Sequence, residues 1–150
     1  PSQERDWLAR GFAYDGAVVV SDAIMYNDAY TWLRTNDLSF DVLIMPPDDT
    51  AFTSILSYKI PYVSDVYYSA ALSSLPEWHE RVSVLYPLMN NPVDSDIWQE
   101  SWESLQAQLG DQSAIYLFPN DSTADTDSLQ TFGLELLFAG ENASIYRYTP

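Results

Sequence analysis

Residues 15–22 have the sequence DGAVVVSD and residues 40–50 the sequence FDVLIMPPDDT, and these two stretches decide the fold. Each contains a short apolar run rich in branched side chains, Ala17–Ser21 in the first and Phe40–Met45 in the second, which is typical of a strand buried on both faces. A helical pattern follows each run. A strand and a helix, twice in succession, predict a parallel α/β core. The helical segments are Tyr26–Leu33, with Asn27 or Asp28 able to cap it, and Thr50–Tyr58.

The rest of the chain adds further elements to this core. Trp98, Trp102 and Leu105 recur at four- and three-residue spacing, which predicts a helix that the preceding aspartates cap and Gly110 ends. All elements together predict one domain over residues 1–150, with an α/β fold: a three-layer, Rossmann-like, mostly parallel sheet with a C-terminal antiparallel hairpin. The other expected elements are a helix over Pro1–Arg10, a short strand at Pro61–Ser64, either a helix near Pro76 or a strand at Arg81–Tyr86, the helix over Ile97–Leu109, a strand over Ala114–Phe118, a polar loop over Pro119–Asp127, and the hairpin Leu134–Ala139 with Ala143–Tyr148.

The charge of the chain is strongly biased toward acids. There are 22 Asp and Glu residues against 6 Lys and Arg, which gives a formal net charge of -16, and Lys59 is the single lysine. Such an excess keeps a surface hydrated when salt screens charge, and it predicts a high-salt habitat. The same charge repels phosphate backbones and anionic headgroups, so we expect no nucleic acid among the partners.

The compartment is only partly constrained by the sequence. The absence of cysteine removes disulfides and thiol chemistry together. Apolar runs are far shorter than the roughly 20 residues of a membrane helix, and no signal peptide precedes Pro1, so we expect either a soluble chain or an excised soluble part of a larger protein. Two Asn-x-Ser sequons, at Asn120 and Asn142, are possible glycosylation sites and suit the cell surface.

Three aspartates form the candidate metal site. Asp22, Asp48 and Asp49 follow the two predicted parallel strands directly, where α/β folds place their ligand crevice. Carboxylate oxygens are the ligands that Mg²⁺ and Ca²⁺ prefer, so a divalent cation is the one cofactor that the sequence allows. The alternative, which the abundance of aspartate favours, is that Asp48 and Asp49 begin a helix and that Asp22 is a solvated loop residue.

Other catalytic signatures are weak. His79 is the single histidine, and no Gly-x-Ser-x-Gly nucleophile turn accompanies it, so an exposed histidine is a better interpretation than a catalytic base. The turns that follow the two strands lack a glycine-rich phosphate loop. We therefore expect no nucleotide or dinucleotide cofactor.

Aromatic side chains are the remaining candidates for a role in binding. The chain has 11 Tyr, 5 Trp and 6 Phe residues. A concentration of them, Tyr58, Tyr62, Tyr67 and Tyr68, is a candidate contact surface for a sugar ring or a protein. Packing in the core or at its border is the more frequent role of such residues.

A family resemblance is carried by the two ends of the chain. Trp7-Leu8 in the first helix, DGAVVVSD at 15–22 with the Tyr-rich helix that follows, and FAGENASIYRY at 138–148 resemble the extracytoplasmic C-terminal domain of archaeal GT-C-type membrane glycosyltransferases, of the oligosaccharyltransferase or protein mannosyltransferase kind, and related polytopic surface proteins. The resemblance implies that catalysis lies in acidic loops between membrane helices outside this segment, with a polyprenyl-phosphate sugar as donor. It transfers no catalytic residue to this chain.

Three functions are compatible with these observations. The leading hypothesis is a noncatalytic accessory domain on the extracellular face of the membrane of a halophile, which recognises a glycan or protein acceptor or stabilises the transmembrane part of the same chain. The first alternative is an autonomous secreted α/β hydrolase or metal-dependent enzyme that uses Asp22, Asp48 and Asp49 near His79. The second alternative is a cell-surface protein-binding module that docks through its tyrosines.

Overall fold

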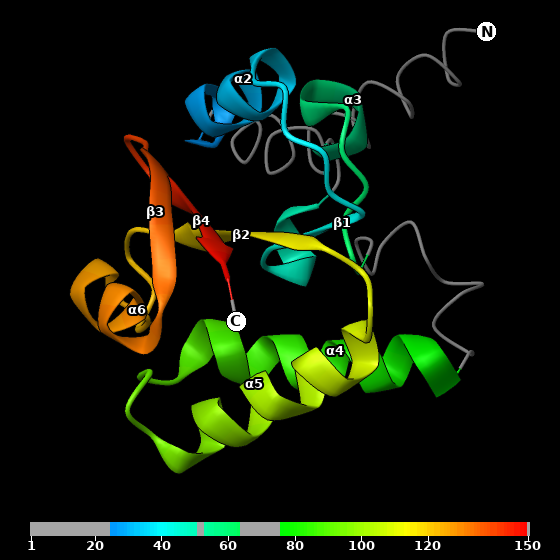
Figure 1. Cartoon of the computed structure of the whole chain (residues 1–150), viewed down its shortest axis with the longest axis vertical. Helices are drawn as coiled ribbons and strands as arrows, with labels where there is room; N and C mark the ends of the chain where they lie inside the picture. Colours follow the sequence, from blue (N-terminus) through cyan, green and yellow to red (C-terminus); the bar gives the residue numbers. More distant parts are fainter. Residues whose placement is uncertain (1–24, 51–52, 64–75, 150) are drawn as a thin grey trace, which may run out of the picture.

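The computed structural model describes residues 25–50, 53–63 and 76–149, and these form helices on both sides of a small mixed sheet (Figure 1). The class of the fold, a mixture of helices and strands in one sheet, is as the sequence predicts. The Pro1–Arg10 helix and the Ala17–Ser21 strand lie outside the described residues. The described elements are α2 (Asn27–Thr35), β1 (Val42–Ile44), η1, a single 3₁₀ turn (Pro47–Asp49), α3 (Thr53–Ser57), α4 (Pro76–Asn90), α5 (Asp96–Leu109), β2 (Ala114–Pro119), α6 (Thr126–Phe132), β3 (Leu134–Ala139) and β4 (Ala143–Tyr148).

The sheet has the strand order β1-β2-β4-β3. β1 and β2 are parallel, with Leu43 opposite Ile115, whereas β4 is antiparallel to both β2 and β3. The predicted hairpin is therefore confirmed, and it supplies two of the four described strands. The described sheet is mixed because β4 folds back against β2, so that one of the three described strand pairs is parallel.

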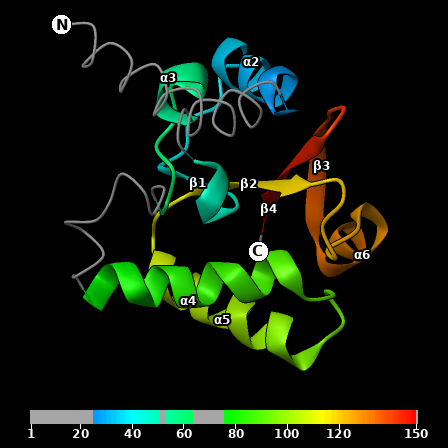
Figure 2. The ribbon, with the colours of Figure 1, turned by 180° about the vertical axis from the view of Figure 1, so that it is seen from behind.

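Each strand presents alternate residues to opposite faces, and both faces are covered by helices (Figure 2). Ile44, Tyr116 and Tyr146 point toward α4, α5 and α6 and join the larger core cluster. Leu43 and Ile145 point the other way and pack against α2. This explains why β1 and β2 are continuously apolar, since neither face of these two strands meets water.

The larger core is centred on stacked aromatic rings. Trp98 and Trp102 of α5 stack with their ring centroids 5.5 Å apart, and Phe132 of α6 meets both of them edge-on. Trp98 is fully buried, and its indole N–H donates to the backbone carbonyl of Leu88 at 3.0 Å. The spacing that predicted the α5 helix thus identifies the residues that hold α5 to the rest of the fold.

Several helix boundaries differ from the sequence-based expectation. Residues 81–86 belong to the helix α4 and not to a strand, because Val84, Leu85, Leu88 and Met89 form one buried helical face. The cap of α5 is Ser95, whose hydroxyl group accepts from the Trp98 N–H, and not one of the neighbouring aspartates. α2 has no side-chain cap: Tyr26 occupies its N-cap position.

The loop predicted over Pro119–Asp127 is shorter than expected, because α6 begins within it. Asp125 caps α6 and accepts hydrogen bonds from the backbone and side chain of Ser128, which lower the pKa of the Asp125 carboxyl group. The predicted Pro61–Ser64 strand is reduced to a single parallel bridge between Pro61 and Leu43 within the described residues. Among the described helices, none combines the length and the apolar character that crossing a bilayer requires.

Candidate functional site

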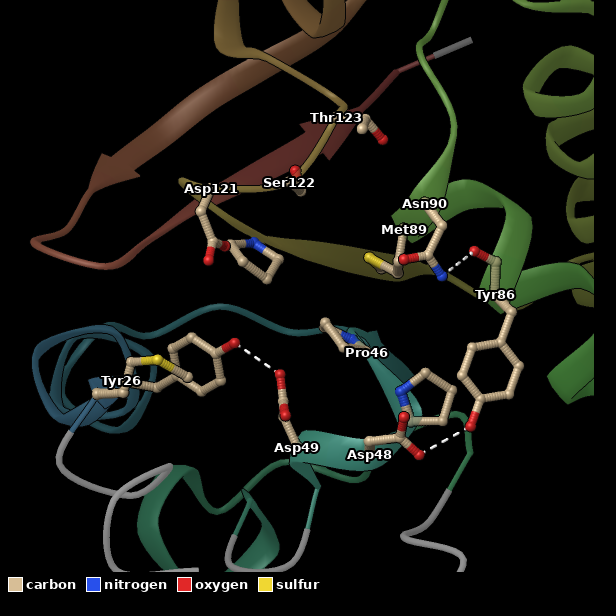
Figure 3. Close-up of a pocket in the computed structure, with 13 residues that line it drawn as sticks. Tyr26, Pro46, Asp48, Asp49, Tyr86, Met89, Asn90, Asp121, Ser122 and Thr123 are labelled. Carbon is tan, nitrogen blue, oxygen red and sulfur yellow. Dashed lines mark hydrogen bonds between the residues drawn. The ribbon is translucent and has the colours of Figure 1, made fainter. Parts of the chain in front are cut away.

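A crevice of about 380 Å³ opens where the parallel strands β1 and β2 end (Figure 3). Its position is the one expected for ligands in α/β folds, beyond the carboxyl ends of the strands. Four segments meet there: the start of α2, the turn η1 after β1, the end of α4 and the loop after β2. The residues that line it are Met25, Tyr26, Pro46, Pro47, Asp48, Asp49, Tyr86, Met89, Asn90, Pro119, Asp121, Ser122 and Thr123.

Two aspartates of η1 are held by tyrosines from two different helices. Tyr86 of α4 donates to Asp48 Oδ1 at 2.7 Å, and Tyr26, at the start of α2, donates to Asp49 Oδ2 at 2.7 Å. The Tyr30 hydroxyl group donates to the Asp49 backbone carbonyl at 3.3 Å. Both acids lie in the first turn of η1 but make no side-chain cap there, since Pro46 is the N-cap residue. Their carboxylates bridge η1 to helices instead, which the sequence did not indicate.

The opposite wall of the crevice is made of polar side chains from two segments. Asn90 ends α4, and its amide group donates to the Tyr86 carbonyl at 2.8 Å. Asp121 and Thr123 come from the loop after β2 and are exposed. The crevice therefore presents carboxylate, amide and hydroxyl groups in a cavity large enough for one or two sugar rings.

The predicted metal site is only partly described. Asp48 and Asp49 line the crevice, as predicted from their position after a strand, whereas Asp22 lies outside the described residues. Within residues 25–50, 53–63 and 76–149, no three acids or histidines are close enough together to hold a metal ion. The divalent cation therefore stays a prediction that depends on Asp22.

His79 is not among the residues that line this crevice. It is exposed on α4 with its ring edge-on to Trp78, at 5.2 Å between centroids. Seven residues separate it from Tyr86, which corresponds to about 10 Å along a helix. The structure therefore does not bring His79 together with Asp48 and Asp49, as the hydrolase hypothesis requires.

The predicted aromatic surface divides between the surface and the core. Tyr58 is 73% exposed, whereas Tyr62 is 5% exposed and donates to Gln108 Oε1 at 2.8 Å. Burial raises the pKa of the Tyr62 hydroxyl group, and the neighbouring Arg81 acts in the opposite direction. Tyr62 is thus a core residue and not part of an exposed surface. Tyr67 and Tyr68 lie outside the described residues.

Both sequon asparagines are engaged in tertiary hydrogen bonds around the β3–β4 turn. Asn120 donates to the carbonyls of Gly140 and Glu141, at 3.0 and 3.1 Å. Asn142 donates to the Met25 carbonyl at 3.0 Å and so ties the same turn to the beginning of α2. Asn142 thereby connects this turn to Met25, one of the residues that line the crevice.

Comparisons of this chain with protein-family models, with curated proteins and with solved structures give no match. The function is therefore argued from the crevice itself. Sequence reasoning located Asp48 and Asp49 but missed the other polar lining residues, Tyr26, Tyr86, Asn90 and Asp121 among them. The available signal was the helical spacing of apolar residues in α4, which places Tyr86 and Asn90 one turn apart.

Proposed function

We propose that this chain is a noncatalytic accessory domain of a membrane glycosyltransferase-like protein, on the extracellular face of the membrane of a halophile, and that its crevice recognises the hydroxyl groups of a glycan acceptor. The observation that carries the proposal is the pair of tyrosine-held aspartates, Asp48 and Asp49, at the carboxyl ends of β1 and β2. The membrane setting rests on the resemblance described above.

The chemistry of the crevice suits neutral sugars. Asp48 uses Oδ1 for Tyr86, while its Oδ2 has no partner among the described residues and can accept from a ligand hydroxyl group. Hydrogen bonds to a charged carboxylate are about twice as strong as neutral ones, which compensates for the competition of water. The half-buried Tyr86 ring at one end of the crevice offers apolar surface to a sugar ring.

The charge of the crevice restricts the ligand further. Asp48, Asp49 and Asp121 are all acidic residues, and no lysine or arginine of the described residues lines the cavity. An acidic sugar such as a uronate would place its carboxylate beside these groups without a compensating cation. The proposed ligand is therefore a neutral oligosaccharide.

The proposal extends to the architecture of the whole domain. We propose that the whole domain is three-layered and Rossmann-like, with the described sheet as its middle layer. The helices on both faces of the described sheet support this arrangement.

The test is a calorimetric titration of the full chain with neutral glucose and mannose oligosaccharides in about 2 M NaCl, where charge repulsion is screened. We expect weak binding by the wild type and a loss of about tenfold or more in Asp48→Ala, because a charged hydrogen-bonding group is removed. The matched control is Asp111→Ala, an exposed aspartate in the turn after α5, which should bind normally. Absence of binding by the wild type, or normal binding by Asp48→Ala, would refute the glycan site.

The membrane setting has a separate test. The reading frame upstream of Pro1 is expected to encode several apolar spans of about 20 residues each. A secretory signal peptide directly before this domain would instead contradict the accessory role.

A further inference from the structure

Three of the four described lysine and arginine side chains lie along one short segment, residues 58–62, beside the edge of the sheet. Arg34 lies over the Tyr58 ring at 5.9 Å, Lys59 belongs to the segment, and Arg81 lies over the Tyr62 ring at 4.5 Å. The chain from residue 58 to residue 62 spans at most about 14 Å, so the two arginines lie at opposite ends of one short segment. In a chain of net charge -16, such a concentration of cations is unexpected. We call Arg34, Tyr58, Lys59, Ile60 and Arg81 the basic edge.

These cations are not neutralised by ion pairs in the described part of the chain. The salt bridge found there joins Arg147 to Glu135 and lies elsewhere. Arg34 and Lys59 donate to the backbone carbonyls of Leu56 and Leu38 instead, at 3.0 and 3.1 Å. Glu80 lies next to Arg81 in sequence, but its charge does not pair with the guanidinium group. Lys59 is half-buried, with its ammonium group over the Phe40 ring at 4.8 Å, so the exposed Arg34 and Arg81 are the cations that remain available for an external anion.

Two large apolar side chains project from the same segment. Tyr58 is 73% exposed and Ile60 is 68% exposed, so both protrude from the surface. Tyr58 also has a φ of 59°, a left-handed conformation that glycine or asparagine adopts far more easily at the end of a helix. Folding gains little from a strained, exposed tyrosine, which favours a role in contact with a partner.

The backbone of this segment is unsuited to pairing with another strand. Ile60 and Tyr62 already use one backbone group each to bond Leu43 of β1, and Pro61 between them has no N–H group. A proline at a sheet edge is a common device against strand addition. The partner must therefore be recognised by side chains.

We infer that the basic edge docks on an anionic lipid surface, with Tyr58 and Ile60 inserted among the headgroups and Arg34 and Arg81 contacting phosphates. Protruding apolar side chains flanked by cations match a soft interface better than the groove of a folded protein. This inference uses residues outside the crevice, so it stands or fails independently of the proposed glycan site.

The dependence on salt has an unusual sign. At about 0.15 M salt the Debye length is about 8 Å, and the acidic remainder of the domain is repelled by an anionic membrane. At molar salt the Debye length shrinks to about 3 Å, so that contacts at the basic edge survive while the repulsion of distant acids does not. Insertion of apolar side chains is not screened at all. Binding is therefore expected to strengthen with salt, opposite to an ordinary basic patch.

The experiment is sedimentation of the full chain with vesicles of phosphatidylcholine alone or mixed equally with phosphatidylglycerol, at about 0.15 M and about 2 M NaCl. We expect binding to the mixed vesicles at the higher salt and a loss of this preference in Arg34→Gln/Arg81→Gln. Tyr58→Asn with Ile60→Ser should lose about tenfold or more, because burial of one isoleucine side chain exceeds a factor of ten in affinity. Asparagine tolerates the left-handed conformation, so this variant should keep its fold.

The control variant is Ile97→Ser, which removes an exposed isoleucine from α5, outside the basic edge, and should bind as the wild type does. No sedimentation with mixed vesicles at either salt would overturn the inference. Unchanged binding by the two basic-edge variants would also overturn it. Binding to soluble polyglutamate in place of vesicles would assign the edge to an acidic protein and equally refute a lipid partner.

Discussion

The hydroxyl group of Tyr86 donates a 2.7 Å hydrogen bond to Asp48 Oδ1 and thereby joins α4 to η1 across the crevice. Tyr26 and Asp49 form a matching contact from α2. Each acid is thus oriented by a tyrosine from a helix that packs on a different face of the sheet. A ligand meets carboxylates that are already positioned, which lowers the entropy cost of binding.

Removal of the Tyr86–Asp48 hydrogen bond should weaken the binding of oligosaccharide more than it destabilises the fold. In Tyr86→Phe, Asp48 loses its orienting donor, and we expect the affinity for neutral oligosaccharide to fall roughly three- to tenfold, while the free energy of unfolding changes by about 1 kcal/mol. Titration and denaturant unfolding measure the two effects. Tyr146→Phe is the matched control: it removes a 2.8 Å contact with Thr126 that lies away from the crevice. Equal losses of affinity in both variants would show that the effect is not local.

The parts of the fold that the sequence predicted are those where neighbouring residues carry the information. The strand around Val42–Ile44 is apolar without interruption because both of its faces are buried, and the tryptophans of α5 are spaced for one helical face. Gly110 ends α5 with a φ of 57°, as a glycine at that position predicts. These features follow from local periodicity and local backbone preferences.

The missed features depend on contacts between distant segments. Tyr86 meets Asp48 across 38 positions of sequence, and Tyr26 meets Asp49 across 23. The hydrophobic periodicity of the sequence does not indicate which distant residues form such pairs. The helix α4 was ambiguous because Pro87 interrupts its pattern, although a proline within this helix removes only one backbone donor. Asp48 and Asp49 were therefore predictable, but Asp121 and the tyrosines that orient the two acids were not.

The β3–β4 turn should be intolerant of any side chain at Gly140. An added Cβ atom would lie 2.5 Å from the Ala143 carbonyl oxygen and 2.9 Å from Asp28 Oδ2. Asp28 also accepts from the Glu141 N–H at 2.8 Å, so the clash would disturb both the turn and its attachment to α2. We expect Gly140→Ala to destabilise the fold by about 1–3 kcal/mol in thermal or denaturant unfolding. The control is Gly110→Ala, where backbone strain alone acts because no atom lies within 4 Å.

Alkaline pH should destabilise the fold through Tyr116. Burial raises the pKa of its hydroxyl group to about 12, from an ordinary value of 10.0, and Gln106 donates to its oxygen at 3.0 Å. As the pH rises, the unfolded chain therefore loses the Tyr116 hydroxyl proton at a lower pH than the folded chain does. The stabilising contribution is complete below pH 10 and is lost as the pH rises toward 12, with a total of roughly 2–3 kcal/mol. Unfolding of Tyr116→Phe as a function of pH should show a shallower decline than unfolding of the wild type, and an equal decline would contradict this role of Tyr116.

We expect the fold to require salt for its stability, and we assign part of this requirement to repulsion between acidic side chains on α5. Asp96, Glu100 and Glu103 are exposed at spacings of four and three residues, so like charges face each other on one side of the helix. Glu100→Lys would turn both repulsions into attractions and should stabilise the fold by about 0.5–1 kcal/mol in low salt, with little effect in molar salt. Glu141→Lys makes the same change of net charge in an exposed turn and serves as the control. Equal stabilisation by both would attribute the salt requirement to net charge and not to α5.

The two sequons should differ in their glycosylation, because a glycan on asparagine replaces one hydrogen of Nδ2. Asn120 Nδ2 faces two backbone carbonyls, and Asn120 Oδ1 accepts from Ser144 at 2.9 Å, so this side chain is fixed between β2 and the β3–β4 turn. Asn142 Nδ2 donates only to the Met25 carbonyl among the described residues, and its second N–H is available. In a host that glycosylates Asn-x-Ser, peptide mapping by mass spectrometry should find the glycan at Asn142 and not at Asn120. Ser122→Ala removes the Asn120 sequon and should leave the mass of the glycoprotein's glycan unchanged. A glycan on Asn120 in folded protein would contradict the structural role given to that side chain.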